Sequence, residues 1–189
     1  MSGSGSVPKS DADIALDIAN KLVKKGIKVV ALDFDQTIVS VHTSGCWKQG
    51  SVKLTSHVRP CFRHLIPKLM EAGLRVAVVT YSMQSGLISD VLNSALKDCD
   101  TNRIVIKTSS KDWEGESCAE TLGKQQHIAS VLTDLYNEDH TNIIQSNEIL
   151  LLDDDMDNVT VAVNFGHKAF AITDNVSLES LCRYVNNAL

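Results

Sequence analysis

The sequence predicts an α/β protein with three layers and a Rossmann-like, doubly wound parallel sheet. Short runs of consecutive apolar residues, typical of strands buried on both faces, alternate along the chain with segments whose apolar residues recur every three or four positions. This alternation indicates βαβ units, which place helices on both faces of a parallel sheet. The 189 residues are few enough for one domain and enough to bury a sizeable core.

Composition and charge argue against several classes of protein. No apolar run approaches the roughly 20 residues of a membrane span. The start of the sequence lacks a signal-peptide pattern, so we expect a cytoplasmic protein without a membrane partner. A net charge of −5 and the absence of long Lys/Arg runs argue against nonspecific nucleic-acid binding. The five cysteines are scattered, and we expect reduced, mostly buried thiols.

The first ordered element is expected near residue 11. Residues 1–10 are rich in Ser and Gly and predict a flexible tail, which leaves residues 11–189 as a single domain. From Asp11 the apolar positions recur every four residues, and Gly26 is placed to end the helix.

A predicted central strand at 29–32 ends in two aspartates. Side chains at positions i and i+2 of an extended chain point the same way, so Asp33 and Asp35 leave the strand close together while Phe34 faces the core. Two neighbouring carboxylates favour a hard dication, and Mg²⁺ is the predicted cofactor. The alternative is that one aspartate caps the next helix and the other is solvated.

The remaining elements follow in alternation. Residues 38–58 carry alternating apolar residues around Ser44-Gly45 and predict a short β-flap. The further expected elements are a helix from Pro60 to Gly73, a strand 74–79, a helix around 87–96, a strand 103–106, a helix 121–135, a strand 149–152, a short helix, a strand near 169–172 and a final helix from Ser177.

Polar residues at these strand ends resemble the four motifs of the haloacid dehalogenase (HAD) superfamily of phosphoryl-transfer enzymes. The matching segments are Asp33-Phe34-Asp35-Gln36-Thr37, then Thr80, then Lys124, then Asp153-Asp154-Asp155-Met156-Asp157-Asn158. Val58-Arg59-Pro60 and Lys124-x-x-His127 look like the small magnesium-dependent phosphatases and phosphoprotein phosphatases of that superfamily. The resemblance implies a HAD-like fold. Cap domains of that superfamily are inserted after the first motif or after the second-motif unit, and neither segment here is long enough for a large one.

The resemblance also implies roles for individual residues. Asp33 is the expected nucleophile, which forms an aspartyl-phosphate, and Asp35 the general acid and base. Thr80, Tyr81 and Lys124 are expected to bind the phosphoryl group. The resemblance further implies a metal site, with Asp33, the main-chain carbonyl of Asp35 and Asp154 as Mg²⁺ ligands, supported by Asp153 and Asn158.

Several of these residues have rivals or simpler interpretations. Ser82 competes with Thr80, which by itself also fits a helix cap, and Lys107 competes with Lys124. His127 is expected to be a packed or surface histidine. The insertion residues His42, Trp47 and Trp113 are predicted either to touch substrate or to pack.

The expected function is hydrolysis of a phosphomonoester, with a phosphoprotein or another bulky phosphate as substrate. A small phosphometabolite is the alternative substrate, and a noncatalytic HAD-like binding protein is the alternative class. A phosphoacceptor receiver domain uses similar residues, but its motifs occur in another chain order. Dehalogenation is disfavoured because that chemistry does not use the second aspartate of the first motif.

Overall fold

The computed structural model describes residues 9–109 and 122–189, so most of the predicted tail lies outside the described residues. The described helices are α1 (Asp11–Lys24), α2 (Gly50–Thr55), α3 (Pro60–Glu71), α4 (Ser85–Ala95), α6 (Gln125–Glu138), α7 (Met156–Asn164) and α8 (Leu178–Asn187). The described strands are β1 (Val29–Leu32), β2 (Arg75–Thr80), β3 (Val105–Thr108), β4 (Ile149–Asp153) and β5 (Lys168–Ala171). Ser10, assigned to the tail by the sequence, caps α1 through a hydroxyl that accepts from the Asp13 N–H.

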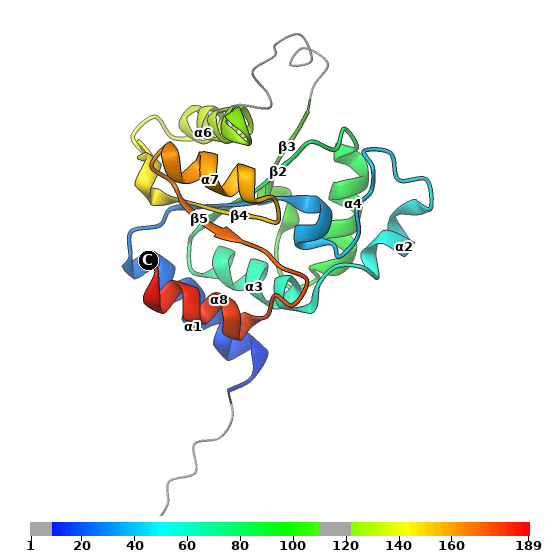
Figure 1. Ribbon diagram of the computed structural model, residues 1–189, viewed down its shortest axis with the longest axis horizontal. Helices are drawn as coiled ribbons and strands as arrows, with labels where there is room; N and C mark the ends of the chain where they lie inside the picture. The colour runs from blue at the N-terminus through cyan, green and yellow to red at the C-terminus, as the bar shows by residue number, and fades with distance from the viewer. Residues whose placement is uncertain (1–8, 110–121) are drawn as a thin grey trace, which may run out of the picture.

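The five strands form one parallel sheet in the order β3-β2-β1-β4-β5. The motif strand β1 is central, with β2 on one side and β4 on the other, and the chain runs outward from it in both directions (Figure 1). Receiver domains have the order 2-1-3-4-5, so the strand order rules out that alternative. The predicted doubly wound α/β fold is confirmed.

Helices cover both faces of the sheet. Figure 1 shows α6 and α7 on one side, with α1, α3 and α8 on the other. Alternate residues of each central strand divide between two buried clusters: Val29 and Ala31 of β1 pack with α6 and α7, whereas Val30 and Leu32 pack with the other helices. Strands buried on both faces explain why the sequence shows continuous apolar runs instead of alternation.

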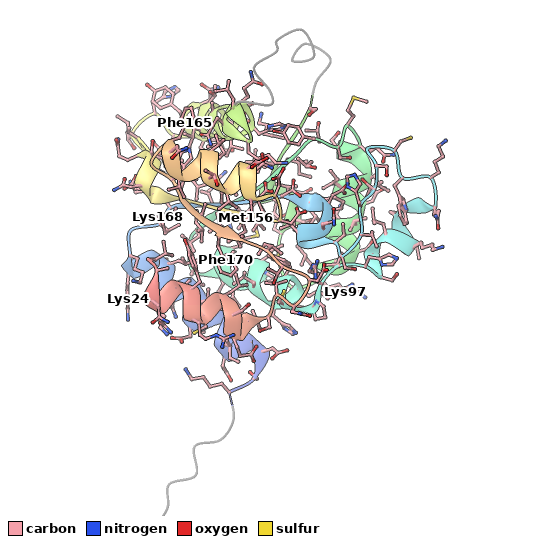
Figure 2. All side chains as sticks on the ribbon, viewed as in Figure 1. Lys24, Lys97, Met156, Phe165, Lys168 and Phe170 are labelled. Carbon is pink, nitrogen blue, oxygen red and sulfur yellow. The ribbon has the colours of Figure 1, made fainter. Side chains whose placement is uncertain are left out.

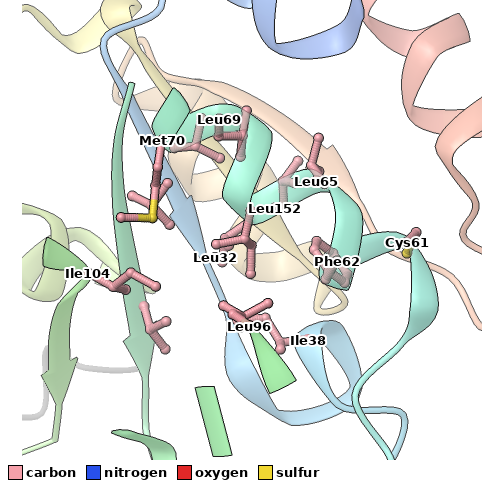
Figure 3. Close-up of a cluster of buried hydrophobic side chains, with 14 of the residues drawn as sticks. Leu32, Ile38, Cys61, Phe62, Leu65, Leu69, Met70, Leu96, Ile104 and Leu152 are labelled. Atoms are coloured by element: carbon pink, nitrogen blue, oxygen red, sulfur yellow. The ribbon is translucent and has the colours of Figure 1, made fainter. Parts of the chain in front are cut away.

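The larger cluster lies beneath α3. Figure 3 shows Leu65 and Leu69 of this helix beside Leu32 and Leu152 of the two central strands, and all four side chains are at most 1 % exposed. Leu32 and Leu152 immediately precede Asp33 and Asp153, so this packing fixes the carboxyl ends of β1 and β4. The strand ends that carry the aspartates are therefore attached to a fully buried core.

The predicted β-flap is wrong. Within residues 38–58 the structure has one antiparallel bridge, between Val39 and Val58, and the helix α2 where a second strand was expected. The alternating residues Val52 and Leu54 lie on this helix, with Val52 84 % exposed and Leu54 fully buried. Packing of α2 against α4 decides its conformation, and six residues are too few for their pattern to separate a helix from a strand. No large cap is present in the described residues.

Several cysteines and apolar side chains of the described residues are partly or fully exposed at the surface. Cys46 is exposed, Cys99 and Cys182 are half-buried and only Cys61 is buried, so the expectation of mostly buried thiols is wrong for the described cysteines, which are free. Met156 and Phe165 stand at the two ends of α7 with half or more of their surface exposed, as isolated apolar residues often do (Figure 2). No helix within residues 9–109 and 122–189 has the length and apolar character to cross a membrane.

Candidate active site

Three adjacent strands end in polar residues at the same edge of the sheet. Asp33 follows β1, Thr80 ends β2 and Asp153 ends β4, and all three are buried. Since β1 lies between β2 and β4, these residues are neighbours although they are far apart in the sequence. The order of the strands reverses direction at β1, and open α/β sheets bind ligands at the carboxyl ends of the strands at such a point.

A tight turn over Phe34–Ile38 shapes the first strand end. Its Gln36 has a φ of 55°, in the left-handed region, and Phe34 accepts a hydrogen bond from the Val39 N–H at 3.0 Å. The turn buries Phe34 and leaves Asp33 and Asp35 lining one cavity, as the spacing of the two aspartates predicts.

Lys124 occupies the centre of the site. Its Nζ lies 2.6 Å from Asp33 Oδ1 and 3.9 Å from Asp153 Oδ2, and its side chain is 2 % exposed. Gly123 has a positive φ of 49°, and a Cβ there would lie 3.0 Å from Asn158 Oδ1, so glycine allows α6 to begin close to the acidic loop. The rival Lys107 instead pairs with Asp134 on α6 at 2.7 Å and does not line the cavity.

The loop after β4 is held by its own residues. Asn158 Nδ2 donates to both carboxylate oxygens of Asp153, at 3.1 and 3.2 Å, and the Asp155 N–H donates to Asp153 Oδ1 at 3.0 Å. The buried hydroxyl of Thr37 donates to Asp154 Oδ1 at 3.1 Å, which links this loop to the turn after β1. Asp153 is thus fixed, and Asp154 remains half-exposed at the cavity wall.

The loop after the turn binds Asp35. Oδ2 of Asp35 accepts from the Thr43 N–H at 2.8 Å and lies 3.0 Å from His42 Nδ1, and the Thr43 hydroxyl lies within hydrogen-bond distance of both carboxylate oxygens. Thr43 was not among the residues predicted from the sequence, where its only signal is a hydroxyl group in the polar loop that follows the motif. His42, considered as a possible substrate contact, meets the second aspartate of the motif.

The loop after β2 forms the opposite wall. Oγ1 of Thr80 accepts from the Ser82 N–H at 3.2 Å, and both residues line the cavity, so the structure brings the two rivals to the same place. The ring of Tyr81 lies over Lys124 Nζ, 4.0 Å from its centroid, which is a cation–π contact. Trp47 packs outside the cavity lining, where its backbone N–H and C=O both pair with the Gln84 amide.

The whole cavity has a volume of about 570 Å³. Its lining is mainly acidic and polar: Asp33, Asp35, Gln36, His42, Ser44, Gly45, Thr80, Tyr81, Ser82, Lys124, Asp153, Asp154, Asp155 and Asn158. All predicted site residues are therefore brought together around one space. Trp113, the remaining candidate for substrate contact, lies outside the described residues.

The buried charges do not balance. Burial raises the pKa of Asp33 to about 7, with Asp153 and Asp154 adding to the shift and Lys124 opposing it. Burial also raises the pKa of Asp153. For Lys124, burial lowers the pKa but the carboxylates of Asp33 and Asp153 outweigh it and leave the pKa raised. The Lys124 ammonium faces the carboxylates of Asp33 and Asp153, and Asp154 adds a third carboxylate near Asp33. A further cation would favour the ionised forms of Asp33 and Asp153.

The oxygen donors at this site fit Mg²⁺ better than a metal that needs a full protein cage. Within the described part of the chain, no three His, Cys, Asp or Glu side chains are grouped to hold a metal. Mg²⁺ usually takes only one or two protein carboxylates and keeps several waters. Asp33 and Asp154 both line the cavity and would be two such carboxylates, and the charge of a bound Mg²⁺ would offset the excess of acidic groups.

His127 is a packed residue, as expected. It is 2 % exposed, and its ring meets the Tyr81 ring edge-on at a centroid distance of 5.3 Å. Burial and the nearby Lys124 charge lower the pKa of His127 to about 4, against a partly compensating hydrogen bond with the Thr80 backbone. The histidine is therefore neutral at neutral pH and supports the aromatic ring that covers Lys124.

Comparison with known proteins gives a likeness of fold. No protein-family model matches the sequence, and neither does any curated protein sequence. Among solved structures, a hypothetical protein from Xanthomonas campestris matches with a TM-score of 0.52 and 13 % identity, over 96 % of this chain and 93 % of that one. The HAD domain of effector protein Lem4 from Legionella pneumophila, an inactive mutant, matches with a TM-score of 0.47 and 13 % identity, over 85 % and 94 % of the two chains. The Xanthomonas match shows a shared fold.

The buried neutral state of His127 predicts a pH dependence of stability. The unfolded chain takes up a proton on this residue below about pH 6.5, whereas the folded protein does so only near pH 4. The contribution of neutral His127 to the free energy of unfolding, fully present above pH 6.5, is therefore lost as the pH falls toward 4. We expect His127→Gln to reduce the loss of unfolding free energy between pH 6.5 and about 4.5 by about 2 kcal/mol, measured by urea denaturation. His140→Gln, at an exposed histidine, is the control and should leave the loss unchanged.

Proposed function

We propose that this protein is a Mg²⁺-dependent phosphomonoester hydrolase of the HAD superfamily that acts through an aspartyl-phosphate. The observation that carries the proposal is the set of contacts made by Asp33. This carboxylate ends the central strand, is buried, and lies 2.6 Å from a buried lysine beside Thr80 and a second acidic loop. The motif order in the sequence and the sheet topology both support it.

In the first step, an oxygen of Asp33 attacks phosphorus in line and the bond from phosphorus to the leaving oxygen breaks. Asp35 donates a proton to that oxygen, so the product leaves as an alcohol. The Thr80 hydroxyl and the Lys124 ammonium bind phosphoryl oxygens, while Lys124 also favours the ionised form of Asp33. Two neighbouring carboxylates acting separately as nucleophile and as acid give each step a group suited to it.

In the second step, Asp35 takes a proton from water, which attacks the phosphorus of the aspartyl-phosphate and releases phosphate and free Asp33. Asp33, Asp154 and the carbonyl of Asp35 would hold Mg²⁺, with Asp153 and Asn158 fixing the loop that carries Asp154. Bound there, Mg²⁺ would neutralise charge on the phosphoryl group.

A phosphoprotein or another bulky phosphate is the proposed substrate. A cavity of about 570 Å³ is larger than a phosphoryl group needs, and no large cap covers it in the described residues. A small phosphometabolite is the alternative, and a panel of phosphopeptides and sugar phosphates distinguishes the two. A cytoplasmic location stays a prediction from composition.

Loss of the nucleophile tests the chemistry directly. We expect Asp33→Asn to abolish Mg²⁺-dependent turnover of an aryl phosphate, because an amide neither attacks phosphorus nor offers a metal a charge. The variant should stay folded, since the Asn is neutral and relieves repulsion among the acids. Steady-state kinetics with circular dichroism measures both. Near-normal turnover by this variant would remove Asp33 from the mechanism.

The acid role of Asp35 predicts a dependence on the leaving group. Asp35→Asn should reduce kcat for alkyl phosphates by about 10² to 10⁴, the usual contribution of proton transfer. The loss should be smaller for aryl phosphates with acidic leaving groups, which depart without protonation. Parallel kinetics on both substrate types checks this. Equal losses on both would assign Asp35 to another role.

A phosphoryl analogue tests the ground-state geometry without turnover. Beryllofluoride with Mg²⁺ should bind at Asp33 and raise the melting temperature, whereas neither alone should do so. Thr80→Ala and Lys124→Ala should each weaken the shift measured by differential scanning fluorimetry. Lys107→Ala is the matched control, because Lys107 pairs with Asp134 away from the cavity. A shift that persists in Asp33→Asn would place the anion elsewhere.

A further inference from the structure

Arg59 is a buried arginine whose only ion pair is with a solvent-exposed carboxylate, among the described residues. Its side chain is 9 % exposed, and its NH2 group lies 3.5 Å from Oδ1 of Asp174, a side chain that is 95 % exposed. An ion pair with so exposed a partner contributes little. The Nε atom of Arg59 is also buried without a hydrogen-bond partner in the described structure. The ion pair with Asp174 therefore does not compensate for the cost of burying the guanidinium, and other contacts must explain its position.

The strong contacts of Arg59 are to backbone carbonyls. NH2 donates to the Gln36 carbonyl at 3.0 Å, and NH1 donates to the Asp174 carbonyl at 2.8 Å. Its own N–H donates to the Ile38 carbonyl at 2.9 Å. Arg59 therefore holds the turn after β1 at two points and ties it to the loop between β5 and α8.

The held turn is a strained one. Gln36 adopts a φ of 55°, which side chains other than glycine rarely adopt, and its N–H donates to the Val41 carbonyl at 3.1 Å. With Arg59 on its carbonyl, both backbone groups of Gln36 are fixed. Such strain persists only where the surrounding structure maintains it. Asp35 immediately precedes this residue and Thr37, which donates to Asp154, immediately follows it.

Helix stability does not account for the arginine. Arg59 is the N-cap residue of α3, and its side chain makes no capping hydrogen bond. A cation is disfavoured at that end of a helix because the helix dipole is positive there. Arg63, one turn further along, also donates to carbonyls, those of Thr55 at 2.6 Å and Val58 at 3.3 Å, but neither carbonyl belongs to the turn.

We infer that Arg59 is a positioning residue: it fixes the Gln36 carbonyl and so holds the strained turn in the conformation that presents Asp33 and Asp35 to one cavity. The inference rests on the proposed function for its effect on catalysis. In this role the guanidinium acts through the backbone of the turn and needs no contact with the substrate. Its two hydrogen bonds diverge to separate loops, which the planar fork of arginine satisfies and a lysine ammonium satisfies less well.

The first experiment compares Arg59→Met with Arg63→Met. Both substitutions remove a carbonyl-bound guanidinium from the start of α3, so both should lower the melting temperature. Only Arg59→Met should lower kcat, by about 10- to 100-fold, with KM changed less than about threefold, because displacement of reacting groups affects turnover more than binding. Arg59→Lys should be intermediate, and it replaces Arg59→Met if that variant does not fold. Unchanged kcat in both Arg59 variants, or an equal fall in Arg63→Met, would overturn the inference.

Amide hydrogen exchange gives a readout that needs no activity. Exchange in residues 34–41, which contain the Gln36 and Val39 hydrogen bonds, should accelerate in Arg59→Lys and stay at the wild-type rate in Arg63→Met. If the wild-type protein turns over no phosphoester, the proposed function fails and exchange alone decides whether Arg59 holds the turn. Wild-type exchange rates in Arg59→Lys would contradict the inference whatever the activity.

Discussion

The buried ion pair between Lys124 and Asp33 is the interaction on which the candidate site depends. The two charged groups lie 2.6 Å apart, with side chains 2 % and 7 % exposed. Removing the lysine would leave buried carboxylates without a compensating cation, which is far more unfavourable than losing an exposed pair. The lysine also faces Asp153, so its charge serves two carboxylates from two strands. Its position at the start of α6 joins one helical layer to the edge of the sheet.

The strand order explains why these charges meet at all. A strand placed between β2 and β4 ends beside both, and parallel strands all end at the same edge. Complete burial of the strand bodies leaves their polar ends as the place where side chains of opposite charge can meet. The acids exceed the lysine in number, and this imbalance is the physical reason to expect a metal cation in the proposed enzyme.

The segment after the turn acts as a fixed wall of the site. Thr43 and His42 bind Asp35, the Gln84 amide pairs with both backbone groups of Trp47, and α2 packs on α4. Arg59 donates to the Gln36 carbonyl of the turn itself. The second aspartate of the motif is thus held by donors from the following loop, whereas the first is paired with the Lys124 ammonium. Different surroundings for two adjacent carboxylates suit different chemical roles.

The sequence by itself determined the α/β class, the order of strands and helices, and the paired aspartates at the end of the central strand, because these follow from short-range periodicity and from runs of apolar residues. It also supplied the candidates Thr80, Lys124 and Asp153 through their order along the chain. Only the tertiary structure places Lys124 beside Asp33 and Lys107 beside Asp134, since both are single lysines near element ends and contact alone separates them. It likewise replaced the expected flap with α2 and revealed Thr43 and Arg59, whose partners lie in other loops and leave no periodic trace in the sequence.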